Sequence, residues 1–140
     1  MLVFDVRERL DAPPEIAWEH LVDWENAHRW MPGVESLHAE GDSGVGTRLV
    51  FVTRGKERTS TITGFEPGRT VALESKQGSV AATYRYTIEP SASAGSEIRL
   101  SVALDVRGPL RLIAPVIKHA IRKSDQDQLT RFREWLEQRA

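Results

Sequence analysis

Residues 108–137 read GPLRLIAPVIKHAIRKSDQDQLTRFREWLE, and this stretch decides the fold. Its apolar residues recur mostly at three- and four-residue steps, which is the spacing of one face of a helix. They are Leu110, Ile113, Ile117, Ile121, Leu129, Phe132 and Leu136. At ~1.5 Å per residue, about thirty residues span on the order of 45 Å, which is long enough to cross a sheet. We therefore expect residues 109–139 to form one long amphipathic helix, kinked near its start by Pro115.

Upstream of this helix, residues 34–106 alternate between apolar and polar side chains, as strands of an antiparallel sheet with one solvated face do. The clearest segments are residues 45–53, 80–88 and 98–106. Turns that contain glycine or proline separate the strands. Ile62 and Phe65 cannot both face inward on a regular strand, so Gly64 between them predicts a bulge.

The N-terminal residues predict one strand followed by two short helices. One side of the strand carries Leu2, Phe4, Val6 and Leu10. Pro13-Pro14-Glu15 favours a helix start, because proline is tolerated in the first turn and an acid suits the positive end of the helix dipole. We expect the helices at residues 14–22 and 24–30.

The predicted order is strand, two short helices, a run of antiparallel strands and one long C-terminal helix. This order indicates an α+β fold in which a curved antiparallel sheet of six to seven strands carries the helix across its concave face. A single helix fills the interior of a curved sheet less completely than a second sheet would. We therefore expect a cavity between the sheet and the helix.

The composition is that of a single ordinary globular domain spanning residues 1–140, with 40% hydrophobic and 28% charged residues. A net charge of −1 argues against nucleic acid as a partner, because no overall field attracts a polyanion. The lack of cysteine excludes disulfides and thiolate nucleophiles and fits a cytoplasmic location. The first residues are charged where a secretion signal would be apolar, and no apolar run approaches the ~20 residues of a spanning helix. We expect neither export nor an integral membrane segment.

Residues 11–40, DAPPEIAWEHLVDWENAHRWMPGVESLHAE, resemble the opening of the START-related (SRPBCC) superfamily of polyketide cyclase/dehydrase and lipid transport-like proteins. In that family the first strand ends in D-x-P-x-x-[VI]-W. The matching residues here are Asp11, Pro13, Ile16 and Trp18, with Ala17 inserted before the last. Residues 30–34 are similar to the family's W-x-P-G-V element, the turn at residues 65–69 also matches, and residues 108–137 look like its closing helix.

This resemblance covers essentially the whole chain and implies the START-like helix-grip fold. It also implies a cavity that holds a hydrophobic molecule such as a lipid, sterol, polyketide or quinone. A minority of the family's members catalyse reactions in that cavity. Because no residue set is shared across those activities, the resemblance assigns no catalytic residue.

The strand phases, the helical stripe and the loop after the second short helix predict which residues line the cavity. They are Trp30, Leu49, Phe51, Leu73, Tyr84, Tyr86, Val102, Leu104, Ile113, Ile117, Ile121, Gln128 and Phe132. Tyr84 and Tyr86 are the foremost candidates, because a phenol buried in an apolar cavity needs a partner for its hydroxyl. Gln128 and Ser124, near the stripe, are candidates for orienting a ligand. Ordinary core packing is the simpler alternative for each residue, and Trp30 either borders the cavity mouth or fastens the second helix to the sheet.

Motifs for metal or cofactor chemistry do not occur in the sequence. The histidines, which form no metal-binding pattern, are His20, His28, His38 and His119. The glycines of residues 41–46 match no nucleotide-binding motif, and there is no hydrolase elbow. We therefore expect no metal and no other cofactor. Glu57 faces the cavity only in the alternative phase of its strand, so the catalytic residues stay unassigned.

Two of three functional hypotheses concern the cavity. The leading one is the binding, and with it the transport, of a small hydrophobic ligand. The alternative is a polyketide cyclase/dehydrase-type enzyme in which Tyr84 or Tyr86 stabilises an enolate while another group removes a proton.

The third hypothesis, a protein- or membrane-interaction module, rests on the charge of the C-terminal stretch. Residues 110–140 contain seven basic and four acidic residues, which gives a net charge of +3. The basic residues around its start are Arg107, Arg111, Lys118, Arg122 and Lys123. A solvated helix face is the simpler interpretation, and a weak contact with anionic lipid headgroups is the sharper one.

Overall fold

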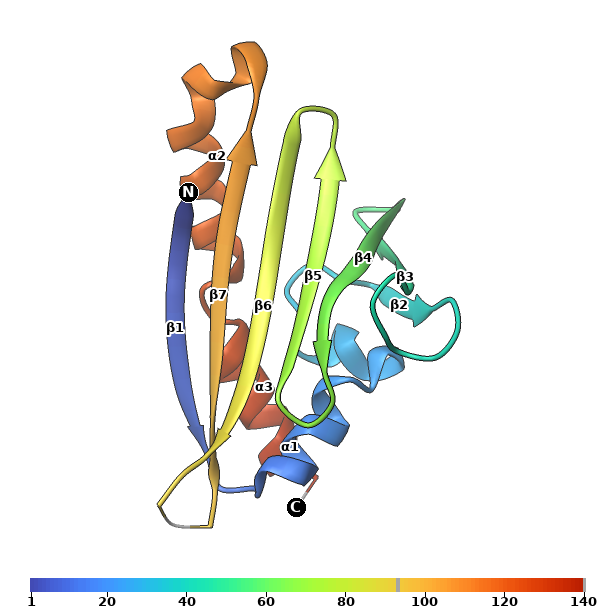
Figure 1. The fold of residues 1–140 in the computed structure, drawn as a ribbon, viewed down its shortest axis with the longest axis vertical. Coiled ribbons are helices and arrows are strands. Elements are labelled where there is room, and N and C mark those ends of the chain that lie inside the picture. The colour runs from blue at the N-terminus through green and yellow to red at the C-terminus, as the bar shows by residue number, and fades with distance from the viewer. Residues whose placement is uncertain (93, 140) are drawn as a thin grey trace.

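Seven antiparallel strands form one sheet in the computed structural model, which describes residues 1–92 and 94–139 (Figure 1). The strands are β1 (Leu2–Leu10), β2 (Ser36–Ala39), β3 (Arg48–Thr53), β4 (Lys56–Glu66), β5 (Thr70–Gln77), β6 (Val80–Pro90) and β7 (Ser96–Val106). Their order in the sheet is β1-β7-β6-β5-β4-β3-β2, so β1 pairs with the last strand and every other neighbour follows in sequence. The loop predicted between β6 and β7 includes residue 93, which lies outside the described residues.

All the helices lie on one face of this sheet (Figure 1). Two short ones follow β1, namely α1 (Pro14–Leu21) and the 3-10 helix η1 (Trp24–Arg29). The C-terminal stretch forms the 3-10 helix η2 (Gly108–Ile113), then α2 (Ala114–Asp125) and α3 (Gln128–Glu137). The predicted α+β architecture, an open sheet with a long helical C-terminal region across it, is confirmed.

The C-terminal stretch is not the one continuous helix predicted, because η2 gives way to α2 at Ala114 and a further break follows α2. Pro115 lies in the first turn of α2, where its missing N–H leaves no hydrogen bond unmade, so it starts the helix instead of kinking it. The further break falls at Gln126 and Asp127, between α2 and α3. Ser and Asp compete with the helix for backbone hydrogen bonds, and residues 124–128 read SDQDQ. The break places Asp125 and Gln128 at the same point over the sheet.

Two strands, β1 and β4, contain register shifts, and the sequence predicts the shift in β4 but not the one in β1. Leu2 was expected to face inward but is 55% exposed, and Val3 is buried in its place, because the register shifts between Leu2 and Phe4. The predicted bulge near Gly64 is confirmed by a register shift between Ile62 and Gly64. That shift lets Ile62 be fully buried while Phe65 still packs against the core.

The C-terminal helices and η1 pack near the two edges of the sheet, and α1 packs on β6 and β7. The C-terminal helices contact β1 and β7 at one edge, and η1 contacts β2 at the other. Edge-to-face aromatic contacts hold these parts together, since Trp30 after η1 lies 4.9 Å from Phe132 of α3 and 5.9 Å from Tyr86 of β6, between ring centres. Part of the sheet between the two edges is left with space above it.

Gly95, just before β7, lies in a tight junction between the end of β1 and the start of β7. A Cβ atom at this position would collide with the backbone carbonyl oxygen of Leu10, which cannot move freely because it ends β1. Gly95→Ala is therefore expected to lower the free energy of unfolding by about 1–3 kcal/mol, as overpacking does. Urea denaturation measures the change.

Gly44→Ala is the matched control, because a Cβ atom at Gly44 has no described heavy atom within 4 Å outside its chain neighbours. This variant should change the stability by less than about 1 kcal/mol. Equal effects of the two substitutions would contradict the packing described for Gly95.

Candidate functional site

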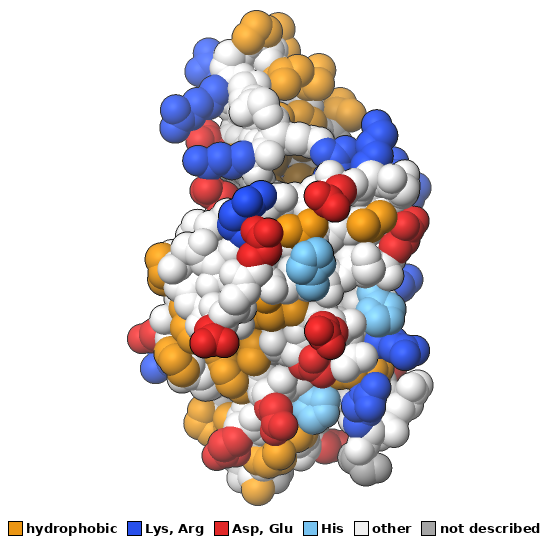
Figure 2. All heavy atoms as spheres, turned by 90° about the vertical axis from the view of Figure 1, so that its right-hand side faces the viewer, with side chains coloured by type: hydrophobic (Ala, Val, Ile, Leu, Met, Phe, Trp, Pro, Cys, Tyr) orange, Lys and Arg blue, Asp and Glu red, His pale blue; other side chains and the backbone are white. Residues whose placement is uncertain are grey.

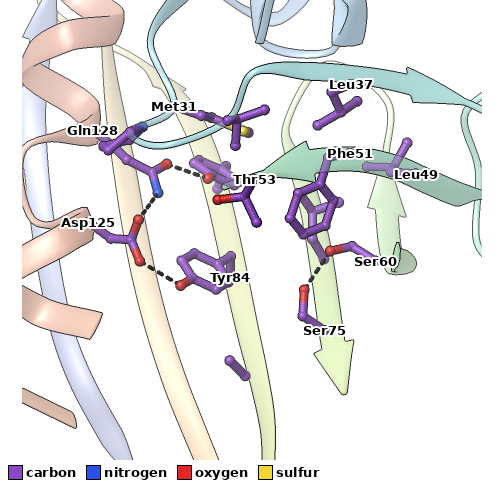
Figure 3. Close-up of a pocket in the computed structure, with 15 residues that line it drawn as sticks. Met31, Leu37, Leu49, Phe51, Thr53, Ser60, Ser75, Tyr84, Asp125 and Gln128 are labelled. Carbon is purple, nitrogen blue, oxygen red and sulfur yellow. Dashed lines mark hydrogen bonds between the residues drawn. The ribbon is translucent and has the colours of Figure 1, made fainter. Parts of the chain in front are cut away.

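A cavity of about 310 Å³ lies between the middle strands and the break that separates α2 from α3. Figure 3 shows its walls. The lining residues are Met31, Pro32, Val34, Leu37, Leu49, Phe51, Thr53, Ser60, Leu73, Ser75, Ala82, Tyr84, Tyr86, Asp125 and Gln128. The cavity therefore fills the space that the edge-packed helices leave open.

The apolar wall follows from the two-residue period of the strands. Leu49 and Phe51 alternate along β3, and Ala82, Tyr84 and Tyr86 alternate along β6, so each set faces the same side. The register of β5 and β6 places Leu73 directly opposite Tyr84. The loop after η1 adds Met31 and Pro32 from the other side.

A chain of hydrogen bonds joins the polar side chains at the helix break (Figure 3). The hydroxyl of Tyr84 donates to Oδ2 of Asp125 at 2.7 Å. Nε2 of Gln128 donates to the other carboxylate oxygen, Oδ1, at 3.0 Å. The hydroxyl of Tyr86 donates to Oε1 of Gln128 at 2.6 Å. We call these four residues the polar cluster; it ties β6 to the end of α2 and the start of α3.

The environment of the polar cluster changes the acidity of its members. Burial raises the pKa of Asp125 above its ordinary value of 3.8, although the hydrogen bonds from Tyr84 and Gln128 act in the opposite direction. Burial, followed by the charge of Asp125, raises the pKa of both Tyr84 and Tyr86, so both phenols stay protonated at neutral pH. A carboxyl with a raised pKa beside a neutral phenol is a group that can exchange a proton with a ligand.

A second polar pair lies on another wall of the cavity, next to Phe51 (Figure 3). The hydroxyls of Ser60 on β4 and Ser75 on β5 are 2.5 Å apart and share a hydrogen bond. Ser60 is buried. A ligand in the cavity would therefore meet hydroxyl groups at one place, the carboxyl at another, and apolar side chains between them.

Six of the sequence-predicted lining residues border the cavity: Leu49, Phe51, Leu73, Tyr84, Tyr86 and Gln128. Trp30, Val102, Leu104 and Phe132 are buried in the core instead. Trp30 is only 1% exposed and packs between Tyr86 and Phe132, which corresponds to the alternative in which it fastens the second helix. Ser124 lies in a neighbouring surface hollow.

The three isoleucines predicted from the helical stripe also lie away from the cavity. Ile117 and Ile121 are half-buried against the core, and Ile113 is exposed. The reason is the path of α2, which packs on the edge strand β1. The guanidinium of Arg122 holds it there by donating to the carbonyl oxygen of Val3.

Asp125 is the functional candidate that sequence reasoning missed. Asp125 lies four residues after Ile121, and Gln128 lies three residues after Asp125. Both therefore continue the helical spacing of Ile117 and Ile121, and this spacing predicts that Asp125 faces inward. A stripe defined by apolar residues alone does not include an acidic residue such as Asp125. The sequence does not predict Ser60 either, because the bulge at Gly64 obscures the phase of its strand.

The other sequence candidates for chemistry lie outside the cavity. Glu57 is exposed on β4. His20 bonds the carbonyl oxygen of Ile16, and His28 bonds that of Glu25. Within residues 1–92 and 94–139, no group of three or more His, Cys, Asp or Glu side chains could hold a metal ion. No helix in the same part of the chain has both the length and the apolarity needed to cross a membrane.

Comparison with known proteins finds one matching family profile and several solved structures with a similar fold. The sequence profile described as polyketide cyclase/dehydrase and lipid transport matches residues 1–137. The structure is similar to the protein TTHA0849 from Thermus thermophilus (TM-score 0.75, 17% identity, 97% of each chain) and to a START superfamily protein from Mycobacterium smegmatis (0.76, 13%, 98% of each). It is also similar to the di-domain ARO/CYC protein BexL of the BE-7585A biosynthetic pathway (0.79, 17%), over 96% of this chain and 46% of that one. No curated protein matches the sequence significantly.

The stability of the Asp125→Asn variant, relative to that of the wild type, is expected to increase as the pH rises. The folded protein keeps the Asp125 proton to a higher pH than the unfolded chain, because its pKa is raised above 3.8. The stability from the protonated carboxyl is complete below the unfolded pKa and is lost as the pH rises through the folded pKa. The free energy of unfolding, variant minus wild type, should therefore be larger at neutral pH than below pH 3.8.

Urea denaturation at the two pH values measures this difference. Asp127→Asn, which changes an exposed carboxyl two residues away, is the matched control and should show a smaller change with pH. A difference for Asp125→Asn that stays constant or shrinks toward neutral pH would contradict the burial of this carboxyl.

Proposed function

Because the chain belongs to the polyketide cyclase/dehydrase and lipid transport family, we propose that it binds a small, neutral, hydroxylated hydrophobic molecule in the cavity. The single observation that carries this proposal is a largely apolar cavity whose wall contains one carboxyl held by two side-chain hydrogen bonds. The lack of cysteine fits a reducing compartment, and we propose the cytoplasm as the location.

The size of the cavity favours a compact ligand. A volume of about 310 Å³ falls at the lower end of the range of about 300–1,000 Å³ for small-molecule sites. Such a space suits one or a few fused rings better than a lipid with two acyl chains. Met31 from the loop after η1, and Leu49 and Phe51 from β3, supply apolar contact to the ring system.

The hydrogen-bonding capacity of the polar cluster favours a ligand that donates. Tyr84 and Tyr86 already direct their hydroxyl hydrogens to Asp125 and Gln128, so their oxygens are left as acceptors. An ionised Asp125 also accepts only. A ligand hydroxyl can donate to these oxygens, whereas a ligand carboxylate would face the charge of Asp125 in a poorly solvated space.

Binding of a naphthol and of naphthalene, measured by calorimetry, tests this proposal. The naphthol should bind roughly tenfold more tightly, because only its hydroxyl can reach the polar cluster. Ala82→Leu, which places extra volume in the cavity, should weaken both ligands on the order of tenfold or more.

Ala103→Leu is the matched control, because Ala103 is exposed on β7 and does not border the cavity. It adds the same volume and should leave both affinities unchanged. Two results would contradict the proposal: no binding of either compound, or binding that Ala82→Leu does not affect.

A second function, a polyketide cyclase/dehydrase-type reaction, is favoured specifically by Asp125. In such a step the Asp125 carboxylate would take a proton from the carbon next to a substrate carbonyl, and the electron pair of that C–H bond would form an enolate. The second N–H of Gln128 could stabilise the enolate oxygen. The enolate carbon would then attack another carbonyl of the same molecule, forming a C–C bond, and the new alkoxide would take the proton back from Asp125.

Turnover of a model polyketone distinguishes this reaction from binding alone. If the cavity catalyses cyclisation, kcat should fall on the order of 100-fold or more in Asp125→Asn, which removes the proton acceptor. Tyr84→Phe should have a smaller effect, since it changes only the hydrogen bond to the carboxyl. Recovery of the compound unchanged from the wild-type protein would rule out the reaction and leave binding.

A further inference from the structure

Four large apolar side chains gather where η2 leads into α2. Leu110, Leu112, Ile113 and Val116 are 40%, 88%, 46% and 67% exposed. This segment extends past the end of β7 (Figure 1), and hydrophobic atoms cap the same end of the molecule (Figure 2). Single exposed apolar residues are common on protein surfaces, but four within seven residues form a patch. We call these four residues the apolar tip.

The fold fully buries none of the four residues of the apolar tip. Among the described residues, η2 contributes no buried side chain, and α2 contributes only Ala114. The inner side of α2 is already occupied, because Ile117 and Ile121 pack against the core. Val116 lies on the opposite side of the helix from Ala114. The tip is therefore available to a partner.

The charge around the apolar tip indicates which partner it suits. Residues 107–124 contain no acidic residue and five basic ones: Arg107, Arg111, Lys118, Arg122 and Lys123. Arg111, Lys118 and Lys123 form no ion pair within the described part of the chain. Lysine and arginine atoms, with acidic atoms among them, also lie along a flank of this end (Figure 2).

A second group of basic residues continues this charge toward the cavity. Ser124 of α2 lines a surface hollow together with Arg54, Lys56 and Arg58 from the β3–β4 hairpin. Pro32 and Thr53 line both this hollow and the cavity. A surface that attracts anions therefore borders the cavity as well as the tip.

We propose that the apolar tip docks this protein on an anionic lipid bilayer. The four side chains would enter the boundary between headgroups and acyl chains, and the surrounding Lys and Arg residues would contact anionic headgroups. A two-fold contact with a second copy would bring the two basic surfaces against each other, whereas an anionic surface attracts them. Charge complementarity thus selects the bilayer over self-association.

Cosedimentation of the full chain with vesicles, without added ligand, tests the docking separately from the cavity. The protein should bind phosphatidylcholine vesicles that contain phosphatidylglycerol, bind pure phosphatidylcholine more weakly, and lose affinity as salt is added. The double variant Leu112→Asp/Val116→Asp should lower the affinity on the order of tenfold or more. Arg111→Glu/Lys123→Glu should cause a loss of similar size on the anionic vesicles.

Two controls match these variants. For the Asp variants of the tip, Val45→Asp places a charge on another apolar residue, which is 71% exposed in the loop before β3. For Arg111→Glu/Lys123→Glu, the control Arg29→Glu/Arg131→Glu makes the same change in net charge near the other end of the molecule. Both should bind like the wild type. Three results would overturn the proposal: no binding to anionic vesicles, binding that the tip variants leave unchanged, or a concentration-dependent dimer that they dissociate, which would assign the tip to a second copy.

Discussion

The hydrogen bonds of Asp125 are the constraint on which the candidate site depends. A carboxyl taken out of water is costly unless its oxygens are satisfied, and here Tyr84 binds one oxygen while Gln128 binds the other. Asp125 ends α2, Gln128 begins α3, and Tyr84 belongs to β6, so satisfying one carboxyl fixes three elements relative to one another. The polar cluster thereby orders the helix break and keeps a buried carboxyl at the cavity wall.

The cavity itself follows from where the helices find support. The edge-to-face contacts of Trp30 with Phe132 and Tyr86 anchor α3, and α2 packs on β1, at the edge of the sheet. The apolar faces of β3 and β5 are therefore not covered as they would be by a second sheet. What remains is an apolar space with polar groups at two places, an arrangement suited to a small ring system that carries hydroxyl groups.

The sequence predicted the architecture well, because hydrophobic periodicity and the resemblance agreed; the family assignment and the sheet with its C-terminal helix are both confirmed. It predicted local phase where strands are regular, as for Tyr84 and Tyr86, and failed at Leu2, where a bulge shifts the register. The cavity wall was harder to predict. Periodicity predicts that Ile117 faces inward, but it does not predict that α2 packs at the edge of the sheet. A pattern of apolar residues also leaves out an inward-facing acid such as Asp125.

The central claim is that the cavity receives a hydroxylated ring through the polar cluster. A crystal structure of the protein with a bound naphthol tests it most directly. The account predicts the ring against Leu49 and Phe51, with its hydroxyl within about 3.2 Å of an oxygen of Asp125, Tyr84 or Tyr86. A ring bound outside the cavity, or inside it with the hydroxyl directed at Ser60 and Ser75 alone, would contradict the account.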